Sequence, residues 1–219
     1  MRTLVINGSP KGKNGNTEIF IQQFIAGMKV PCEICYAVNE DSLQLATYIK
    51  QFDTVIVAMP LYIHAMPGIV MKLIECMEPA SDGGKVMGFI VQSGFMESAQ
   101  SKYLERYLSA LTKHLNYTYL GTVIRGGSAG VYMMPVQMNK KLFKQLRMLG
   151  EYFELNGSFH RGITMELATP KKLSKGKSRM LQFSHKLGLG DNMFWNMMLK
   201  KNNALGREFD KPFGREDLS

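Results

Sequence analysis

A polar loop near the start of the chain combines the groups that hold a phosphate. Residues 7–17 read Asn-Gly-Ser-Pro-Lys-Gly-Lys-Asn-Gly-Asn-Thr and follow a short apolar run at residues 3–6. Glycines expose backbone N–H groups, short hydroxyl side chains donate hydrogen bonds, and a lysine adds positive charge. A helical pattern begins at Thr17, so the helix dipole also favours an anion here. The sequence therefore predicts a phosphate-binding loop with Ser9, Lys11 and Thr17 among its ligands.

Two familiar phosphate motifs do not fit this loop. A P-loop needs four residues between its first glycine and the Gly-Lys-Ser/Thr group, whereas three residues separate Gly8 from Gly12, and Lys13 precedes Asn14. The spacing Gly12-Lys-Asn-Gly15 also differs from the dinucleotide fingerprint Gly-x-Gly-x-x-Gly. The loop is therefore expected to hold a phosphate by another arrangement.

Alternating strand and helix patterns surround the loop. Short runs of apolar and β-branched residues predict strands at residues 3–6, 32–38, 54–58, 85–92 and 119–124. Helical spacing predicts helices at residues 17–28, 42–51, 68–77, 97–114 and 139–156. Ser42 is the predicted N-cap of the second helix. Residues 162–167 have the pattern of a short edge strand.

The first, third and fourth predicted strands are almost continuous apolar runs. Strands covered by helices on both faces have this pattern, so the sequence predicts an α/β fold with a doubly wound, five-stranded parallel sheet. Right-handed crossovers favour the strand order 2-1-3-4-5. Ligands of such sheets bind outside the carboxyl ends of the strands, which directs attention to the loops after strands one, three and four.

Three segments in these loops resemble one family. The segment Gly8–Thr17 is similar to the phosphate loop of flavodoxin-like NAD(P)H-dependent FMN reductases, often written Gly-Ser-Pro-Arg followed by Ser/Gly-Asn-Thr, with Lys11 at the usual arginine. The segment Met59–Gly68 resembles the family's Pro-x-Tyr loop, and Ser93–Glu97 resembles its Gly-Phe-Pro-Glu segment. The resemblance covers roughly residues 1–156 and implies a flavodoxin-like fold.

The resemblance implies FMN as cofactor and NAD(P)H as cosubstrate. It assigns the FMN phosphate to Ser9, Lys11, Asn16 and Thr17. It assigns contacts with the isoalloxazine ring to Pro60, Leu61, Tyr62, Ile63 and His64 on one side and to Ser93, Gly94 and Phe95 on the other. Hydride transfer to a flavin requires positioning rather than an acid or a base, so no catalytic residue and no metal ligand is predicted.

The resemblance also implies a homodimer and a small-molecule electron acceptor. The acceptor is expected to be a quinone, a nitro or azo compound, a flavin or a protein. Two alternatives stay open: a flavodoxin-type electron carrier, and a regulatory module that binds flavin or nucleotide without turnover. Such carriers are acidic as a group, and the net charge of +9 argues against that alternative.

The positive charge is concentrated at the end of the chain. Residues 171–219 hold eleven Lys and Arg against five Asp and Glu, and so six of the nine net positive charges. We therefore expect a flavodoxin-like domain at residues 1–169 and a basic, partly helical extension at residues 170–219, with a linker at 170–179 and helices at 180–187 and 192–200. A solvated basic face is the preferred interpretation, without specific binding of nucleic acid.

Other features point to a protein of the cytoplasm. The apolar run at the N-terminus is too short for a signal peptide, and no stretch has the length of a membrane span. Three cysteines form no disulfide framework, and the pair Cys32 and Cys35 falls in a predicted strand, where positions three apart face opposite ways. The compact run of four cysteines that binds an iron–sulfur cluster in some members of the family is not found in this sequence.

Overall fold

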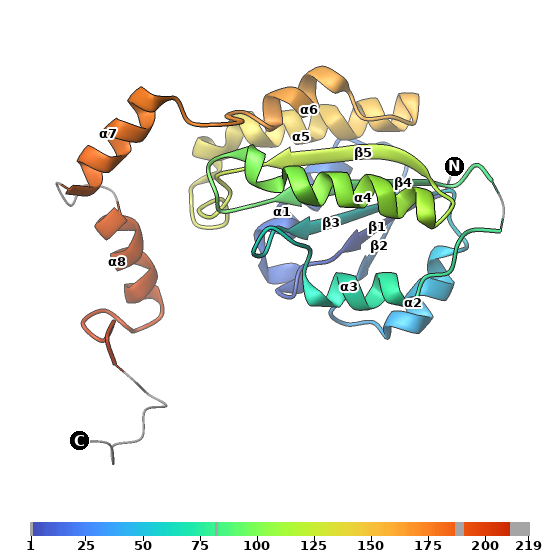
Figure 1. Ribbon diagram of the computed structural model, residues 1–219, viewed down its shortest axis with the longest axis horizontal. Helices are drawn as coiled ribbons and strands as arrows, with labels where there is room; N and C mark the ends of the chain where they lie inside the picture. Colours follow the sequence, from blue (N-terminus) through green and yellow to red (C-terminus); the bar gives the residue numbers. More distant parts are fainter. Residues whose placement is uncertain (1, 82, 187–190, 211–219) are drawn as a thin grey trace, which may run out of the picture. The chain divides into compact units, whose positions relative to one another are not determined.

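Five parallel strands form one sheet in the order β2-β1-β3-β4-β5 (Figure 1). The computed structural model describes residues 2–81, 83–186 and 191–210. The strands are β1 (Thr3–Asn7), β2 (Glu33–Tyr36), β3 (Thr54–Pro60), β4 (Val86–Gln92) and β5 (Thr118–Arg125). This arrangement confirms the predicted fold class and strand order.

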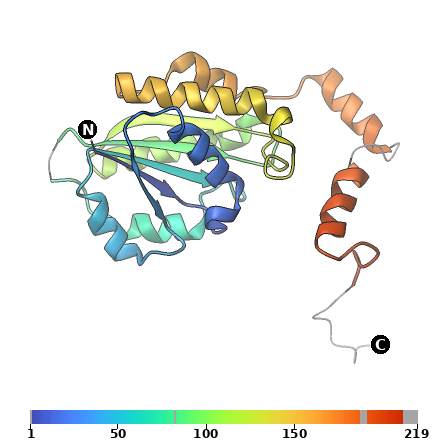
Figure 2. The same ribbon diagram turned by 180° about the vertical axis from the view of Figure 1, so that it is seen from behind.

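Helices cover both faces of the sheet (Figures 1 and 2). One face carries α2 (Ser42–Ile49), α3 (Gly68–Glu75) and α4 (Lys102–His114), and the other carries α1 (Asn16–Ile25), α5 (Val136–Asn156) and α6 (Arg161–Leu167). Successive side chains of a strand point to opposite faces. Leu4 and Ile6 are accordingly buried in the core beneath α2 to α4, whereas Val5 is buried beneath α1, α5 and α6. Two apolar cores therefore hold the sheet between its helices.

The helices α1 and α5 approach each other closely at two glycines. A Cβ atom on Gly150 would lie 1.9 Å from the backbone oxygen of Phe24, and one on Gly27 would lie 1.9 Å from the backbone oxygen of Arg147. Beside this contact, the rings of Phe24 and Phe153 lie 5.7 Å apart between centroids. The absence of two side chains therefore sets the distance between these helices.

The edge strand expected at residues 162–167 is wrong, because this segment is the helix α6. The side chain of His160 accepts a hydrogen bond from Ile163 N at 3.2 Å and so caps the first turn. Ile163 and Leu167, four residues apart, lie on one face of the helix and pack on the core beneath α5. The cap and this packing outweigh the strand propensity of a short β-branched segment.

Helix starts also differ from the prediction, and α5 begins three residues earlier than expected. The N-cap of α2 is Asp41, whose side chain accepts hydrogen bonds at 3.0 Å from Leu43 N and Gln44 N, and Ser42 is the first helical residue. A carboxylate bonds two amides at once, which a serine hydroxyl in the next position does not. The predicted helix at 97–114 begins as a 3₁₀ turn, η2 (Ser98–Ser101), before α4.

The chain divides into two compact units, residues 1–172 and 173–219. The second unit contains α7 (Lys175–Lys186) and α8 (Asp191–Lys201), so α7 occupies the second half of the predicted linker. The sequence of α8 contains the apolar residues Met193, Phe194 and Trp195, whose side chains lie outside the described part of the structure. Among the residues that the structure describes, no helix is both long and apolar enough to span a membrane.

Candidate functional site

The loops after β1, β3 and β4 lie together at the carboxyl edge of the sheet. Each loop is bonded to the neighbouring strand: Gly8 N donates to Ala58 O at 2.8 Å, Leu61 N to Gln92 O at 2.8 Å, and Ser93 N to Arg125 O at 2.9 Å. A Cβ atom on Gly8 would lie 2.4 Å from Val70 Cγ2, so the chain can turn there only without a side chain. The parallel sheet therefore brings the three predicted segments to one edge.

The phosphate loop has a buried floor and an exposed rim. Ser9 and Thr17 are 3% and 1% exposed, whereas Lys11 is exposed. Ser9 Oγ accepts a hydrogen bond from Lys11 N at 3.2 Å, and Thr17 Oγ1 accepts one from Gln92 Nε2 at 3.3 Å. Gly12 has a φ of 50°, a left-handed conformation that favours glycine. Ser9 and Lys11 thus lie within one short turn, and Thr17 lies in the first turn of α1.

The side chain of Asn16, the fourth predicted ligand, connects this loop to another one. Its Nδ2 donates to Ser128 O at 2.7 Å, and its Oδ1 accepts from Tyr132 N at 3.0 Å. Ser128 belongs to the glycine-rich loop that follows the carboxyl end of β5. Asn16 therefore holds two loops together with its side chain.

Beneath the loop lies a polar network centred on the buried Asn7, which the sequence analysis did not identify. Asn7 Nδ2 donates to Glu18 Oε2 at 2.8 Å and to Gly12 O at 3.2 Å, and Asn7 Oδ1 accepts from Ser9 N at 2.9 Å. Glu18 also accepts from Tyr36 OH at 2.9 Å and from Gln22 Nε2 at 2.8 Å. The available signal was the position of Asn7, a polar residue that ends a buried strand just before the loop. This network fixes the shape of the phosphate loop.

The phenol of Tyr36 should make stability depend on pH in alkaline solution. Burial, and secondly its hydrogen bond to Glu18, raise its pKa from 10.0 to about 12. A raised pKa contributes stability that is complete below about pH 10 and is lost as pH rises towards about 12. We expect Tyr36→Phe to reduce this loss, measured as the free energy of urea unfolding at pH values from about 9 to 12. The control is Tyr103→Phe on the surface of α4, and equal pH dependence in wild type and Tyr36→Phe would contradict the assignment.

The loop after β3 contains a tight turn in an unusual conformation. Tyr62 N donates to Ala65 O and Ala65 N to Tyr62 O, both at 2.9 Å, with φ values of 49° at Ile63 and 62° at His64 between them. Positive φ at both central residues is the type I′ geometry, which glycine and asparagine prefer and isoleucine disfavours. Ile63 is nevertheless 91% exposed. Strain of this kind is concentrated at binding and catalytic loops.

An aromatic contact joins the second and third predicted segments. The rings of His64 and Phe95 are stacked, with centroids 5.5 Å apart and planes 5° from parallel. His64 Nδ1 donates to Gln100 O at 3.2 Å. Phe95 is 46% exposed and Ser93 is buried, with Ser93 Oγ donating to Phe95 O at 3.3 Å. The structure therefore brings residues 60–64 and 93–95 into direct contact.

The start of α1 fits a phosphate group of FMN. No side chain caps this helix, and its N-cap is Gly15. A Cβ atom on Gly15 would lie 3.2 Å from Lys11 Cβ and 3.3 Å from Ser9 Oγ, so the missing side chain leaves room between them. The amides of an uncapped first turn favour an anion, and Lys11 and Lys13 add positive charge nearby. The residues present are thus suited to hold the phosphate of this cofactor.

The described residues contain no group of three or more His, Cys, Asp or Glu that could hold a metal ion. Cys32 and Cys35 are free thiols, and burial raises the pKa of both. A raised pKa lowers the thiolate fraction and so makes a thiol less reactive.

Several solved structures share this fold. An NADPH-quinone reductase from P. pentosaceus has 19% identity and a TM-score of 0.53, over 71% of this chain and 99% of the other. An FMN-dependent NADH-azoreductase from Bacillus anthracis, solved in complex with FMN, has 15% identity and a TM-score of 0.54, over 70% and 100%. An NAD(P)H:quinone oxidoreductase from Methanothermobacter marburgensis has 12% identity and a TM-score of 0.55, over 70% and 97%.

Neither a protein-family model nor a curated protein matches the chain. The likeness to the three solved structures therefore concerns the fold. The sheet of this chain has the strand order 2-1-3-4-5 with helices on both faces, and the candidate loops lie at the carboxyl edge of this sheet. The chain accordingly has the flavodoxin-like fold that these reductases share.

Proposed function

We propose that the protein is an NAD(P)H-dependent flavin oxidoreductase that uses FMN. The observation that carries this proposal is the uncapped start of α1 behind Gly15, placed at the same sheet edge as the Tyr62–Ala65 turn and the Ser93–Phe95 loop. A phosphate site and two loops suited to flank a flat ring are what binding of this cofactor requires. The printed names of the structural neighbours, which include quinone and azo reductases, support the same reaction class.

Each loop has a distinct role in this proposal. Lys11 and the first amides of α1 bind the phosphate, with Ser9 and Thr17 forming the floor. Backbone groups of residues 60–64 and 93–95 lie along the flavin ring and orient it. Bound FMN supplies an acceptor for hydride that can release electrons singly or in pairs. The protein contributes positioning and exclusion of water, and no side chain needs to transfer a proton.

The electron acceptor in this proposal is a small molecule of the quinone or azo class. A homodimer, in which a second copy completes the flavin pocket, and a location in the cytoplasm also belong to the proposal. Sedimentation of the FMN-loaded protein tests the dimer separately from the activity. If the FMN-loaded protein is active as a monomer, the proposed reaction class stands, and the flavin pocket does not include a second copy of the chain.

The test of the function is an absorbance scan from about 300 to 550 nm after incubation with FMN and desalting. We expect a flavin spectrum that is bleached by NADPH or NADH without oxygen, because positioned nicotinamide reduces the flavin. A quinone added next should restore the spectrum and support continuous oxidation of NAD(P)H. Protein that retains no FMN would contradict the proposal, whereas FMN retained without bleaching would favour a flavin-binding module that has no reductase activity.

A further inference from the structure

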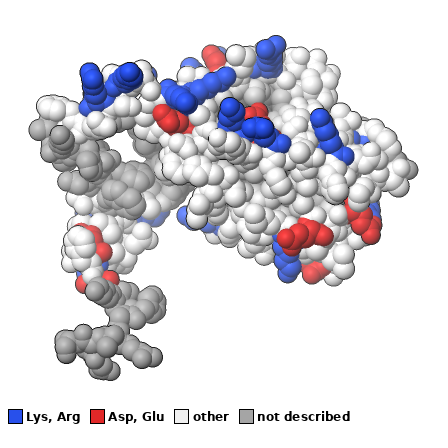
Figure 3. Space-filling view, in the orientation of Figure 1, with Lys and Arg blue, Asp and Glu red and all other residues white. Residues whose placement is uncertain are grey.

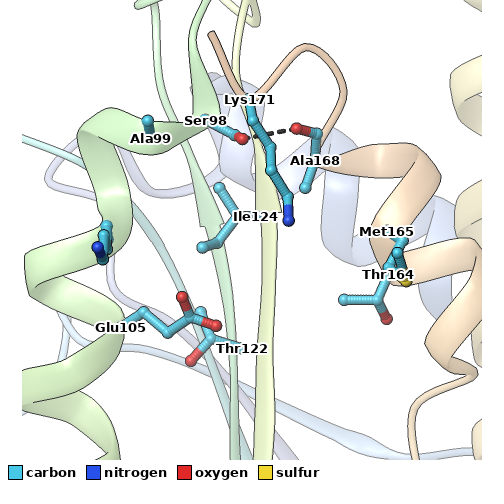
Figure 4. A pocket seen from close by; sticks show the side chains of 10 residues that line it. Ser98, Ala99, Glu105, Thr122, Ile124, Thr164, Met165, Ala168 and Lys171 are labelled. Carbon is cyan, nitrogen blue, oxygen red and sulfur yellow. Dashed lines mark hydrogen bonds between the residues drawn. The ribbon is translucent and has the colours of Figure 1, made fainter.

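A cavity lies along the outer edge of β5 (Figure 4). Among the strands that the structure describes, β5 pairs with β4 alone, and α4 and α6 cover its opposite faces. The cavity is lined from both of these helices and from β5, so it opens at the unpaired edge of the strand. Its volume is about 410 Å³, within the range of small-molecule sites. The residues predicted to bind FMN are not among those that line it.

Two charged side chains of opposite sign point into this cavity. The Glu105 carboxylate comes from α4 and the Lys171 ammonium from the segment after α6 (Figure 4). Within the described part of the chain, neither side chain forms a hydrogen bond or an ion pair within 4.0 Å. Burial raises the pKa of the Glu105 carboxyl, and the charge of Lys171 partly offsets this. Glu105 is half-buried whereas Lys171 is exposed, so the cost of burial falls on the Glu105 carboxylate, and a ligand cation that pairs with this carboxylate is favourable.

The remaining wall is largely apolar. Ile124 of β5, Met165 of α6, Ala99 and Ala168 present carbon atoms to the cavity between the two charges. Lys102 adds a second positive charge at its margin, and Figure 3 shows acidic and basic side chains close together in this region of the surface. The cavity therefore offers one negative site, two positive sites and an apolar surface between them.

We propose that this cavity binds a small amphoteric molecule, an α-amino acid with an apolar side chain. The ammonium group of the ligand pairs with Glu105, its carboxylate pairs with Lys171, and its side chain contacts Ile124 and Met165. A ligand without an ammonium group would leave the half-buried Glu105 carboxylate without an ion pair. A carboxylate at the other end of the ligand would meet the positive charge of Lys171, so the charge pattern favours a molecule that carries both signs.

The first test is calorimetric titration of the full chain with L-leucine, with and without FMN. We expect one molecule to bind per chain with a dissociation constant of about 1 mM or lower. Leucinamide lacks the carboxylate and N-acetyl-leucine lacks the ammonium group, so each should bind at least tenfold more weakly than leucine. The titration does not depend on flavin, so it can succeed or fail independently of the proposed reductase function.

Variants then identify which protein charge pairs with which end of the ligand. Glu105→Gln should weaken the binding of leucine and of leucinamide at least tenfold. It should leave the weak binding of N-acetyl-leucine unchanged. Lys171→Met should weaken the binding of leucine and of N-acetyl-leucine and leave the binding of leucinamide unchanged. The matched controls are Glu151→Gln and Lys140→Met, both exposed on α5 and outside the cavity. Thermal melting of each variant checks that it is folded.

Two results would overturn the proposal. One is the lack of any leucine binding to folded wild-type protein at concentrations of about 10 mM. The other is a leucine affinity that both cavity variants leave unchanged. The paired analogues keep the test decisive on wild-type protein even if one variant fails to fold, because equal binding of leucine, leucinamide and N-acetyl-leucine would exclude pairing with both charges.

Discussion

Replacing Gly150 with alanine is expected to lower the free energy of unfolding by about 3 kcal/mol or more. The new Cβ atom would lie 1.9 Å from the backbone oxygen of Phe24, and a backbone atom cannot rotate away as the end of a side chain can. Relief therefore requires α1 and α5 to move apart, which also disturbs the packing of Phe24 on Phe153. Urea unfolding followed by circular dichroism measures the change.

For the control variant, the expected change in the free energy of unfolding is zero or of the opposite sign. Gly68→Ala lies at the start of α3, and a Cβ atom there meets no atom within 4 Å. Alanine is favoured over glycine in helices by up to about 1 kcal/mol, so Gly68→Ala should leave stability unchanged or raise it. Similar effects of Gly68→Ala and Gly150→Ala would show that helix propensity, not the contact with Phe24, governs residue 150.

Removal of the Asn7 side chain is expected to weaken FMN binding by about thirtyfold or more, equivalent to about 2 kcal/mol. Asn7 bonds Glu18, Gly12 and Ser9, and it is fully buried. Asn7→Ala leaves these groups unsatisfied and frees the loop that holds the phosphate. Titration of flavin-free protein with FMN, followed by quenching of flavin fluorescence, gives the two dissociation constants.

Asn14→Ala provides a matched control in the same loop. Asn14 is exposed, and the only hydrogen bond it forms in the described structure joins its backbone N–H to Lys11 O at 3.0 Å. Its replacement should change FMN affinity less than threefold. An Asn7→Ala protein that is folded and binds FMN as tightly as wild type would disprove the role of Asn7 in shaping the loop.

The sheet could be predicted because its signals are local. Continuous apolar runs such as residues 54–58 are typical of strands covered on both faces, and the polar loops between strand and helix mark the carboxyl edge. The helix α6 was not predicted, because Ile163 and Thr164 favour a strand locally. Its helical form depends on the cap by His160 and on packing against a core built from distant segments.

The candidate site was predictable in position and only partly in detail. Ser9 and Lys11 lie where the sequence places them, in one turn before α1. The use of the Asn16 side chain could not be foreseen, since its partner Ser128 is 112 residues away. The stacking of His64 on Phe95 likewise depends on the spacing of two loops in space, about which a single sequence carries no information.

The two outer strands of the sheet also bear on whether a strand of another molecule can add to the sheet. An unpaired strand edge is a template onto which a strand of another molecule can add, and charges or short length discourage such growth. β2 has only four residues, and its Glu33 pairs with Arg2 at 3.3 Å. At the opposite end of the sheet, the edge of β5 opens into a cavity bordered by Lys102, Glu105 and Lys171. An incoming strand would have to desolvate these charges, so the arrangement protects concentrated solutions of the protein against polymerisation through its sheet.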